Sequence, residues 1–205
     1  MKRLFDLTVA GAGLLVLAPL LVVIAIAIAA TSRGPVLFRQ QRVGLHGRPF
    51  EILKFRTMAH APDASGALIT VAGDRRITGV GRALRASKLD ELPQLVNVVL
   101  GDMSLVGPRP EVPRYVALYP PDVAHRILSV RPGITDEASI LFRNESEILA
   151  AADDAERAYV EELLPRKLAL HLRYAEHHSL AGDIGIILRT VWGIVRRGNS
   201  AAGSS

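Results

Sequence analysis

A long apolar segment dominates the hydrophobic pattern of the N-terminal part of the chain. Residues 7–30 are almost continuously apolar, and no charged side chain lies between Asp6 and Arg33. A straight helix of about 24 residues would measure about 36 Å, enough to cross a hydrocarbon core of ~30 Å. Pro19 follows Ala18 in the middle of the segment, where it removes a backbone donor and bends a helix. The pattern predicts a membrane-associated helix with a kink at these two residues.

Basic residues flank this segment on both sides. Lys2 and Arg3 precede it, and residues 31–60 carry six basic side chains against one acid. Because basic flanks favour the cytoplasmic side, a kinked helix that enters and leaves the same membrane face satisfies both flanks, with arms of about 12 residues. A single transmembrane anchor, a secretory signal cleaved near residues 27–29 and a buried core helix are the alternatives.

The middle of the chain predicts a hairpin and a short helix. Residues 36–38 and 49–58 are rich in β-branched and aromatic residues on either side of a turn at residues 44–47, and residues 59–81 indicate a glycine-rich loop. Apolar residues at 92, 95, 96, 99 and 100 have the spacing of one helical face, and Gly101 is a stop signal. Pro93 is tolerated only in a first turn, so this helix is predicted to begin near Asp90.

Two further helices are expected toward the C-terminus. Residues 151–177 indicate a charged, exposed or interfacial helix with a break near Pro165. Residues 184–195 form an apolar face with Trp192, opposite Arg189, Arg196 and Arg197; this helix either lies on a bilayer or packs in the core. The expected organisation is a membrane helix at residues 1–32, a catalytic domain at 33–197 and a disordered tail at 198–205.

Composition narrows the classes of function. The 205 residues include no cysteine, which excludes disulfides, thiolate metal sites and a cysteine nucleophile. The net charge of +5 and the pI of about 10.0 indicate an anionic partner: a nucleic acid, a membrane surface or a phosphorylated substrate. The aromatic content of 5% and the long apolar segment argue against nucleic acid.

Two adjacent acids are the main candidates for chemistry. Asp90 and Glu91 would lie at a helix N-terminus near Arg85 and Lys88, where a carboxylate that stays ionised can act as a nucleophile or metal ligand. A simple helix cap is the alternative. Arg109 lies between two prolines that restrict its backbone, which suits a guanidinium fixed for a phosphate or a carboxylate; a solvent-facing turn is the alternative, here and at Arg131.

Four segments, in order, resemble one protein family. They are Lys-Phe-Arg-Thr-Met at residues 54–58, Ser-Lys-Leu-Asp-Glu-Leu-Pro-Gln-Leu at 87–95, Gly-Asp-Met-Ser-Leu-Val-Gly-Pro-Arg-Pro at 101–110, and Arg-Pro-Gly-Ile-Thr at 131–135. Together with the apolar helix they resemble the bacterial sugar transferases, the monotopic phosphoglycosyl transferases, over residues 2–195. The resemblance implies an α/β fold, mostly helical with a short hairpin, held in one leaflet by the re-entrant, proline-kinked helix and by interfacial amphipathic helices.

The resemblance also implies a reaction. Such enzymes move a phosphosugar from a UDP-sugar to a polyprenol phosphate, usually undecaprenyl phosphate, and release UMP at the cytoplasmic face of the bacterial inner membrane. Asp90 would be the nucleophile and a ligand of Mg²⁺, and Glu91 would assist it. The implied substrate-binding residues are Lys54, Arg56, Arg85, Pro108, Arg109 and Arg131. The implied partners are the two substrates and an anionic bilayer but no nucleic acid, and a homodimer is compatible with the sequence.

The chain departs from the family pattern at two places. Ala18 stands where many relatives have a serine before the proline, so the kink depends on Pro19 alone. After residues 131–135 many relatives continue Gly-x-Ala-Gln-Val, whereas this chain continues Asp136-Glu137-Ala138-Ser139-Ile140. This change leaves the identity of the sugar open. A non-catalytic membrane adaptor and a nucleic-acid binder are the alternative functions.

Overall fold

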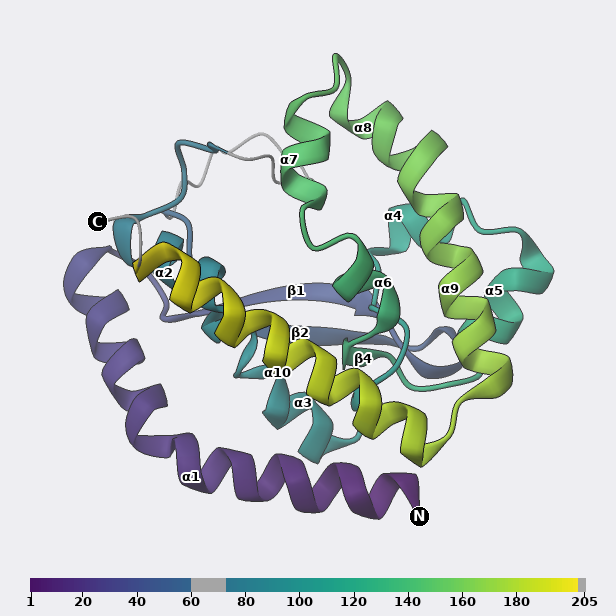
Figure 1. Ribbon diagram of the computed structural model, residues 1–205, viewed down its shortest axis with the longest axis horizontal. Helices are drawn as coiled ribbons and strands as arrows, with labels where there is room; N and C mark the ends of the chain where they lie inside the picture. The colour runs from purple at the N-terminus through teal and green to yellow at the C-terminus, as the bar shows by residue number, and fades with distance from the viewer. Residues whose placement is uncertain (60–72, 203–205) are drawn as a thin grey trace.

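The structure of the protein is mostly helical, with two small sheets (Figure 1). This computed structural model describes the backbone of residues 1–59 and 73–202, and side chains as far as Arg196. Its helices of seven or more residues are α1 (Lys2–Thr31), α2 (Gly79–Ser87), α3 (Gln94–Leu100), α5 (Pro121–Ile127), α9 (Leu164–His177) and α10 (Leu180–Ala202). The shorter ones are α4 (Pro113–Val116), α6 (Glu137–Leu141), α7 (Glu145–Ala150) and α8 (Ala155–Ala158). The predicted mostly helical class is confirmed.

Helix α1 packs through two separate apolar contacts. Its first half places Ala10 in a core shared with α3 and α10, and its second half places Ile24 and Ile28 in a core shared with α2. Figure 1 shows α1 running along the lower edge of the molecule and then turning up its left side. The rest of its surface exposes large apolar side chains: Leu4, Leu15, Val16, Val22, Val23 and Ile26. A helix with this exposure, long and apolar enough to cross a membrane, is not a buried core helix.

The N-terminal turn of α1 is fixed to the rest of the chain by buried polar groups. Lys2 Nζ lies 2.6 Å from Asp183 Oδ2 in α10, and Tyr174 donates to the other oxygen of Asp183 at 2.8 Å. Asp6, 2% exposed, accepts a hydrogen bond from Ser104 at 2.8 Å. The sequence predicted that Lys2 belongs to a basic flank at the membrane surface. In the structure its ammonium group instead bonds to the protein itself.

The predicted hairpin is present. Strands β1 (Leu37–Val43) and β2 (Pro49–Phe55) pair antiparallel, joined through a 3₁₀ turn at Leu45–Gly47. Asn97 of α3 closes the free edge of β2, because its Oδ1 accepts from the Leu53 amide at 3.0 Å and its Nδ2 donates to the Glu51 carbonyl at 2.8 Å. This contact sets the register between α3 and β2, and so places Lys54 beside the turn that precedes α3. Of the predicted loop at residues 59–81, residues 60–72 lie outside the described part of the chain, and α2 begins at Gly79.

A second sheet joins two segments that carry family motifs. Strands β3 (Ser104–Val106) and β4 (Gly133–Thr135) pair in parallel, an element that the sequence did not predict. Gly107 and Gly133 let the two backbones come together at its end: a Cβ on Gly107 would lie 2.3 Å from the Arg131 carbonyl oxygen. The segment that contains Arg109 therefore starts from a fixed point on this sheet.

The second half of the chain builds its own core between α4 and α9. Tyr115, Phe142 and Leu149 pack there against Tyr159. Tyr159 begins a π-helical segment (Tyr159–Leu163) that leads directly into α9, and Pro165 lies in the first turn of α9. The expected helical stretch at residues 151–177 is present from Ala155 to His177, and the predicted break at Pro165 is not seen: the hydrogen-bond pattern changes from π to α just before it, but the backbone stays helical.

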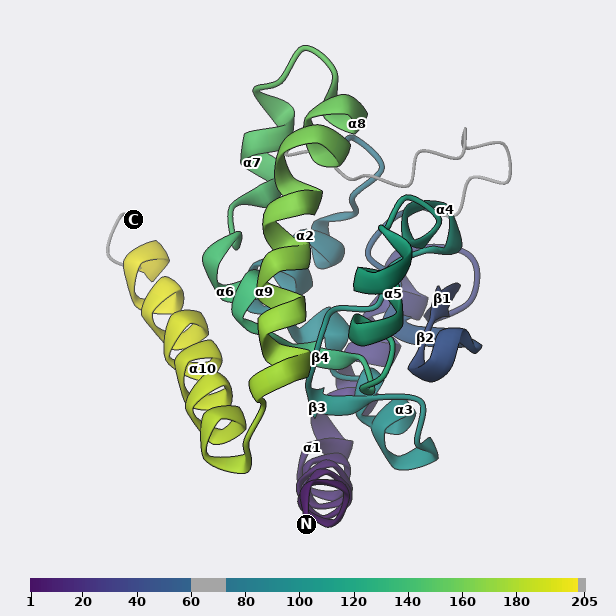
Figure 2. The ribbon, with the colours of Figure 1, turned by 90° about the vertical axis from the view of Figure 1, so that its right-hand side faces the viewer.

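Helix α10 packs on one face and exposes the other. Asp183 and Ile186 are buried, and Thr190 shares a hydrogen bond of 2.7 Å with Thr135. Figure 2 shows α10 along one side of the molecule, away from the hairpin. Most of the predicted apolar face points outward: Ile184, Leu188, Val191, Trp192 and Val195 are all at least 40% exposed. Of the tail predicted at residues 198–205, the backbone is described as far as Ala202, and it is helical there as the end of α10.

Candidate active site

Glu91 is the centre of a cluster of charged side chains from three parts of the chain. Lys54, near the end of β2, places its Nζ 2.9 Å from Glu91 Oε1. Arg109, three residues after β3, donates to both carboxylate oxygens, with Nη1 3.3 Å from Oε2. All three side chains are less than a third exposed. The structure brings together these three predicted residues, separated by 18 and 37 positions along the chain.

Asp90 and Glu91 lie in a short turn and not in α3 itself. Lys88 adopts a left-handed conformation (φ 59°) that ends α2, and a 3₁₀ turn at Leu89–Glu91 follows. Because Pro93 has no N–H to donate, regular α-helical bonding begins only after it, and α3 starts at Gln94. Helical backbone thus begins near Asp90, as predicted, but as a 3₁₀ turn, and the regular α-helix starts only at Gln94, so the two acids are held by the turn.

The Asp90 carboxylate is buried but unengaged. Asp90 is 9% exposed, and within residues 1–59 and 73–196 its side chain has no hydrogen bond or ion pair. Burial raises the pKa of Asp90, and the neighbouring Glu91 raises it further. Lys54, Lys88 and Arg85 act in the opposite direction but with a smaller effect. A carboxylate that is shielded from water and not bonded to protein donors has free lone pairs for a nucleophilic or metal-binding role.

Glu91 has the opposite electrostatic environment. Burial alone would raise its pKa, but Arg109 and Lys54 outweigh burial and hold the pKa of Glu91 well below its usual value. Glu91 in turn raises the pKa of Arg109. Burial lowers the pKa of Lys54, and Glu91 opposes that shift. The two neighbouring carboxylates thus have different environments: Glu91 is a fixed anion between two cations, and Asp90 is the more basic of the two and has no partner among the described residues.

The other predicted substrate-binding residues lie around this cluster or away from it. Arg85 donates to the Thr57 hydroxyl at 2.8 Å and acts on Asp90 through its charge. The buried Arg56 is directed to the end of α1, where it donates to the Ser32 carbonyl at 2.8 Å. Arg131 donates to the Gly101 carbonyl at 2.9 Å, at the C-terminus of α3. Arg56 and Arg131 are therefore already engaged by backbone carbonyls, and their substrate-binding role stays a prediction.

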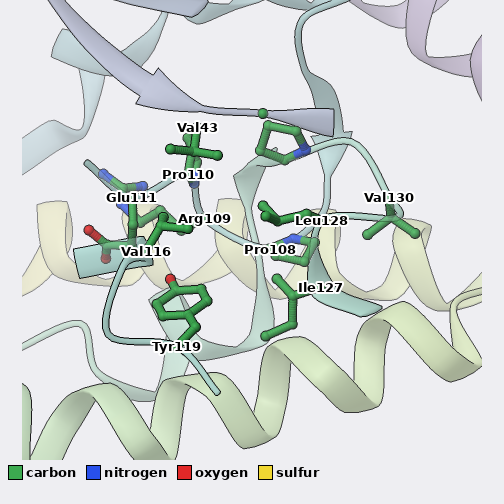
Figure 3. A pocket seen from close by; sticks show the side chains of 12 residues that line it. Val43, Pro108, Arg109, Pro110, Glu111, Val116, Tyr119, Ile127, Leu128 and Val130 are labelled. Atoms are coloured by element: carbon green, nitrogen blue, oxygen red, sulfur yellow. The ribbon is translucent and has the colours of Figure 1, made fainter. Parts of the chain in front are cut away.

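Pro108 borders a small hollow next to Arg109 (Figure 3). The hollow measures about 10 Å³ and is closed by apolar side chains such as Ile127 and Leu128. This volume holds about one water molecule, so the hollow cannot be the site of a sugar nucleotide.

Sequence reasoning missed a buried network that supports the Arg109 segment. Glu111 accepts a hydrogen bond from the Tyr159 hydroxyl, lies 3.8 Å from Lys167 Nζ and lies 3.6 Å from Arg42 Nη1. Lys167 also pairs with Glu145 at 2.9 Å. No local pattern could reveal these partners, because they come from β1, α7, the π-helical segment and α9.

Gln94 is a second residue without a predicted role. It is 0% exposed, and within the described residues neither its side-chain oxygen nor its nitrogen has a hydrogen-bond partner. It lies four positions after Asp90 at the start of α3. A buried amide without partners destabilises the fold by about 1–3 kcal/mol, and only its place in a motif-rich stretch marks it in the sequence.

Comparison with known proteins identifies the family. Residues 1–197 match the family described as bacterial sugar transferase. The chain is 41% identical over 203 residues to a UDP-glucose:undecaprenyl-phosphate glucose-1-phosphate transferase of Caulobacter vibrioides, covering 97% of this chain and 71% of the relative. It is 39% identical to the exopolysaccharide production protein PSS of Rhizobium leguminosarum, covering 97% and 96%. It is 36% identical to a glucose-1-phosphate transferase of the same description from Escherichia coli, covering 94% of this chain but only 39% of the relative. The chain belongs to the bacterial sugar transferase family.

Proposed function

We propose that the protein transfers a phosphosugar from a UDP-sugar to a polyprenol phosphate, with Asp90 as the nucleophile. The observation that supports this most is the contrast between the two acids: Glu91 is bonded to Lys54 and Arg109, and Asp90 beside it is buried but bonded to neither. The names of the relatives make undecaprenyl phosphate the first acceptor and UDP-glucose the first donor to test.

The reaction proceeds in two displacements. An Asp90 oxygen attacks the β-phosphorus of the UDP-sugar, the bond from that phosphorus to the bridging oxygen breaks, and UMP leaves with the electron pair. An oxygen of the polyprenol phosphate then attacks the same phosphorus. The bond to Asp90 breaks, the carboxylate is restored, and a polyprenyl diphosphate sugar forms. The covalent intermediate lets one site serve a soluble donor and a lipid acceptor in turn.

The charged cluster makes an attack of anion on anion feasible. Lys54 and Arg109 carry two positive charges against the single negative charge of Glu91, so the cluster keeps a net charge of +1 beside Asp90. Fixed cations that face a phosphoryl group stabilise the charge that develops on its oxygens during transfer. Glu91 assists by holding both cations in place.

The donor set around Asp90 fits Mg²⁺ held jointly with substrate. Within the described residues no three carboxylate or imidazole side chains converge, and Glu91 is occupied by its two cations. Magnesium commonly takes one or two protein carboxylates together with substrate phosphate oxygens, and the unengaged Asp90 supplies one. When bound, the ion would neutralise part of the charge of the diphosphate.

UMP release tests this function. The full chain in detergent, with undecaprenyl phosphate and a panel of UDP-sugars, should release UMP. Asp90→Asn should reduce release at least a thousandfold and remain in the membrane fraction. Incubation with donor alone should add the mass of a phosphosugar to the peptide with Asp90, and not to the Asn variant. A wild-type protein that releases no UMP would favour the adaptor, and an Asn variant that releases UMP as fast as the wild type would reject Asp90 as the nucleophile. Salt-dependent oligonucleotide binding without UMP release would favour a nucleic-acid binder.

We infer in addition that α1 is re-entrant and bends at Pro19. Both ends of α1 attach to the same folded body: Lys2 bonds Asp183 at one end, and Ser32 accepts from Arg56 at the other. A helix that crossed a ~30 Å core would place its ends in different compartments. Anionic lipid at the cytoplasmic face of the inner membrane fits the basic residues that follow α1, and a homodimer stays a prediction.

The topology can be tested cleanly because the chain has no cysteine. Leu4→Cys and Arg33→Cys introduce exposed thiols at the two ends of α1. In inverted inner-membrane vesicles, an impermeant maleimide should label both, and in spheroplasts it should label neither. Labelling of only one of the two in either preparation would establish a crossing helix.

A further inference from the structure

The buried carboxylate of Asp136 accepts a hydrogen bond from the backbone amide of Arg109. Asp136, 2% exposed, begins the stretch where the chain departs from the pattern of its family. Its Oδ1 accepts from the Ser139 amide at 2.6 Å and so caps α6. Its Oδ2 receives two contacts, from His171 Nε2 at 2.5 Å and from the Arg109 backbone amide at 3.3 Å.

The two prolines beside Arg109 leave its amide as the one backbone N–H that can anchor this segment. Pro108 and Pro110 have no N–H, so the amide of Arg109 is the only backbone donor between residues 108 and 110, and Asp136 accepts from it. The carbonyl of Pro108 accepts from the Gly133 amide at 3.0 Å, and that of Pro110 accepts from Arg42 at 3.0 Å. The backbone is thus fixed on both sides of Arg109, and Asp136 fixes it at Arg109 itself.

His171 fixes Asp136 from the opposite side. It projects from α9, is itself 2% exposed, and belongs to an element far from the catalytic turn in the sequence. Burial alone would raise the pKa of Asp136, but the contact with His171 and the hydrogen bonds from Ser139 together outweigh burial and lower the pKa to about 2. Asp136 is therefore an anion, and His171 Nε2 donates the hydrogen bond between them.

We propose that Asp136 and His171 are positioning residues that hold Arg109 in the orientation in which its guanidinium grips Glu91. Both residues are 2% exposed, and Asp136 contacts Arg109 at its backbone amide and not at its guanidinium. Their effect reaches the reaction only through Arg109. This inference deepens the proposed function and rests on it. It assigns a role to the stretch at residues 136–140 that is structural support of the catalytic arginine and not direct recognition of the sugar.

The geometry can be tested without any activity. Phenylglyoxal modifies accessible guanidinium groups, and mass spectrometry resolves the rate at each arginine. His171→Leu should raise the modification rate of Arg109 severalfold, because its guanidinium is released from Glu91. His171→Gln retains an N–H for Asp136 and should leave the rate near that of the wild type. The rate at Arg39, exposed on the hairpin, provides the internal reference. An unchanged rate at Arg109 in His171→Leu would overturn the proposal.

Kinetics test whether this orientation matters for transfer. His171→Leu should lower kcat for UMP release about tenfold or more, since displacement of a catalytic group by an ångström has effects of this size. KM for the UDP-sugar should change less than about threefold, and His171→Gln should restore most of kcat. His125→Leu, at an exposed histidine of α5, is the matched control and should match the wild type.

Two further comparisons keep the outcomes distinct. If His171→Leu does not fold, Asp136→Asn replaces it, because it keeps the size of the side chain and its cap on α6. A faster modification of Arg109 without any loss of kcat would overturn the positioning role. A wild-type protein that releases no UMP would instead reject the proposed function, a result visible without any variant.

Discussion

Amide substitution of the two adjacent acids should change stability in opposite directions. Asp90→Asn removes a buried carboxylate that has no partner among the described residues, whereas Glu91→Gln removes the anion that pairs with two cations. Both substitutions keep the size of the side chain. We expect Asp90→Asn to stabilise the folded protein and to abolish transfer, and Glu91→Gln to destabilise it.

The size of each effect follows from burial. Removing one partner of a buried ion pair costs about 3–5 kcal/mol. The side chains of Glu91, Lys54 and Arg109 are 12%, 18% and 27% exposed, so water screens part of this, and about 2–3 kcal/mol is expected for Glu91→Gln. For a chain of this length about 1 kcal/mol shifts Tm by about 2–4 °C, which gives a decrease of about 4–12 °C. Relief of the unpaired carboxylate of Asp90 should add about 1 kcal/mol and raise Tm by about 2–4 °C.

The pH dependence separates the two cases. Because burial raises the pKa of Asp90, its charged form lowers stability above the folded pKa, and this cost disappears below the unfolded value of about 3.9. The gain from Asp90→Asn is therefore full above the folded pKa of Asp90 and absent in acid. The pKa of Glu91 is depressed, so its contribution is fully present above the unfolded value of about 4.3 and is lost only as pH falls through its lower folded pKa.

Thermal unfolding followed by far-ultraviolet circular dichroism provides the measurement. The protein is kept in detergent with EDTA, so that no metal binds to Asp90. Asp122→Asn, at a 68%-exposed acid of α5 whose ion pair with Arg126 is exposed to solvent, is a control that should change stability by less than about 1 kcal/mol. Shifts of the same sign and similar size for Asp90→Asn and Glu91→Gln at pH 7 would refute the assignment of different electrostatic roles to these two acids.

Three further predictions concern the packing of the fold and its membrane surface. Gly107→Ala should lower stability by about 3 kcal/mol or more, because its Cβ would lie 2.3 Å from a carbonyl oxygen. At Gly185 in α10 a Cβ would meet nothing within 4 Å, so Gly185→Ala should raise stability by up to about 1 kcal/mol. The Tm of each variant measures the difference. Asp183→Asn removes the shorter of the two ion pairs of Lys2, at 2.6 Å, and leaves only that with Asp6 at 3.9 Å, so it should lower Tm by about 4–8 °C, or about 2 kcal/mol. Emission of Trp192, the single tryptophan, should shift to the blue when phosphatidylglycerol vesicles are added, and Leu188→Asp should prevent the shift.

Local patterns were sufficient to predict the elements whose residues decide their own structure. The apolar segment without charges became α1, and the β-rich stretches around residues 44–47 became the hairpin. The helix predicted at residues 184–195 is present in α10, and most of its predicted apolar face is exposed, but the spacing did not indicate that Asp183 and Ile186 would form the packed face. In each case the signal lies within a few residues of the element it predicts.

The features that the sequence did not predict depend on contacts between residues far apart along the chain. Arg56 follows Lys54 by two positions, and a continued strand would place both side chains on one face. Strand β2 ends at Phe55, however, and Arg56 turns to the carbonyls at the end of α1. The start of α3 is set by two local features that the apolar spacing does not reveal. Lys88 takes a left-handed conformation that ends α2, and α3 begins directly after Pro93. The contacts of Asp136 and Glu111 join segments that no periodicity connects.

The pairing of Glu91 explains how the site can hold two cations ready for a diphosphate without a large loss of stability. Lys54 and Arg109 would be unpaired buried charges if Glu91 were absent, and each would weaken the fold. With Glu91 between them they are neutralised in part and fixed in position, yet the net charge of +1 remains to attract phosphate. Because both cations contact Glu91, its lone pairs are occupied, and the function we propose therefore assigns the nucleophile to the adjacent Asp90, which no cation contacts directly among the described residues. The division of labour between the two acids therefore follows from which of them the cations contact.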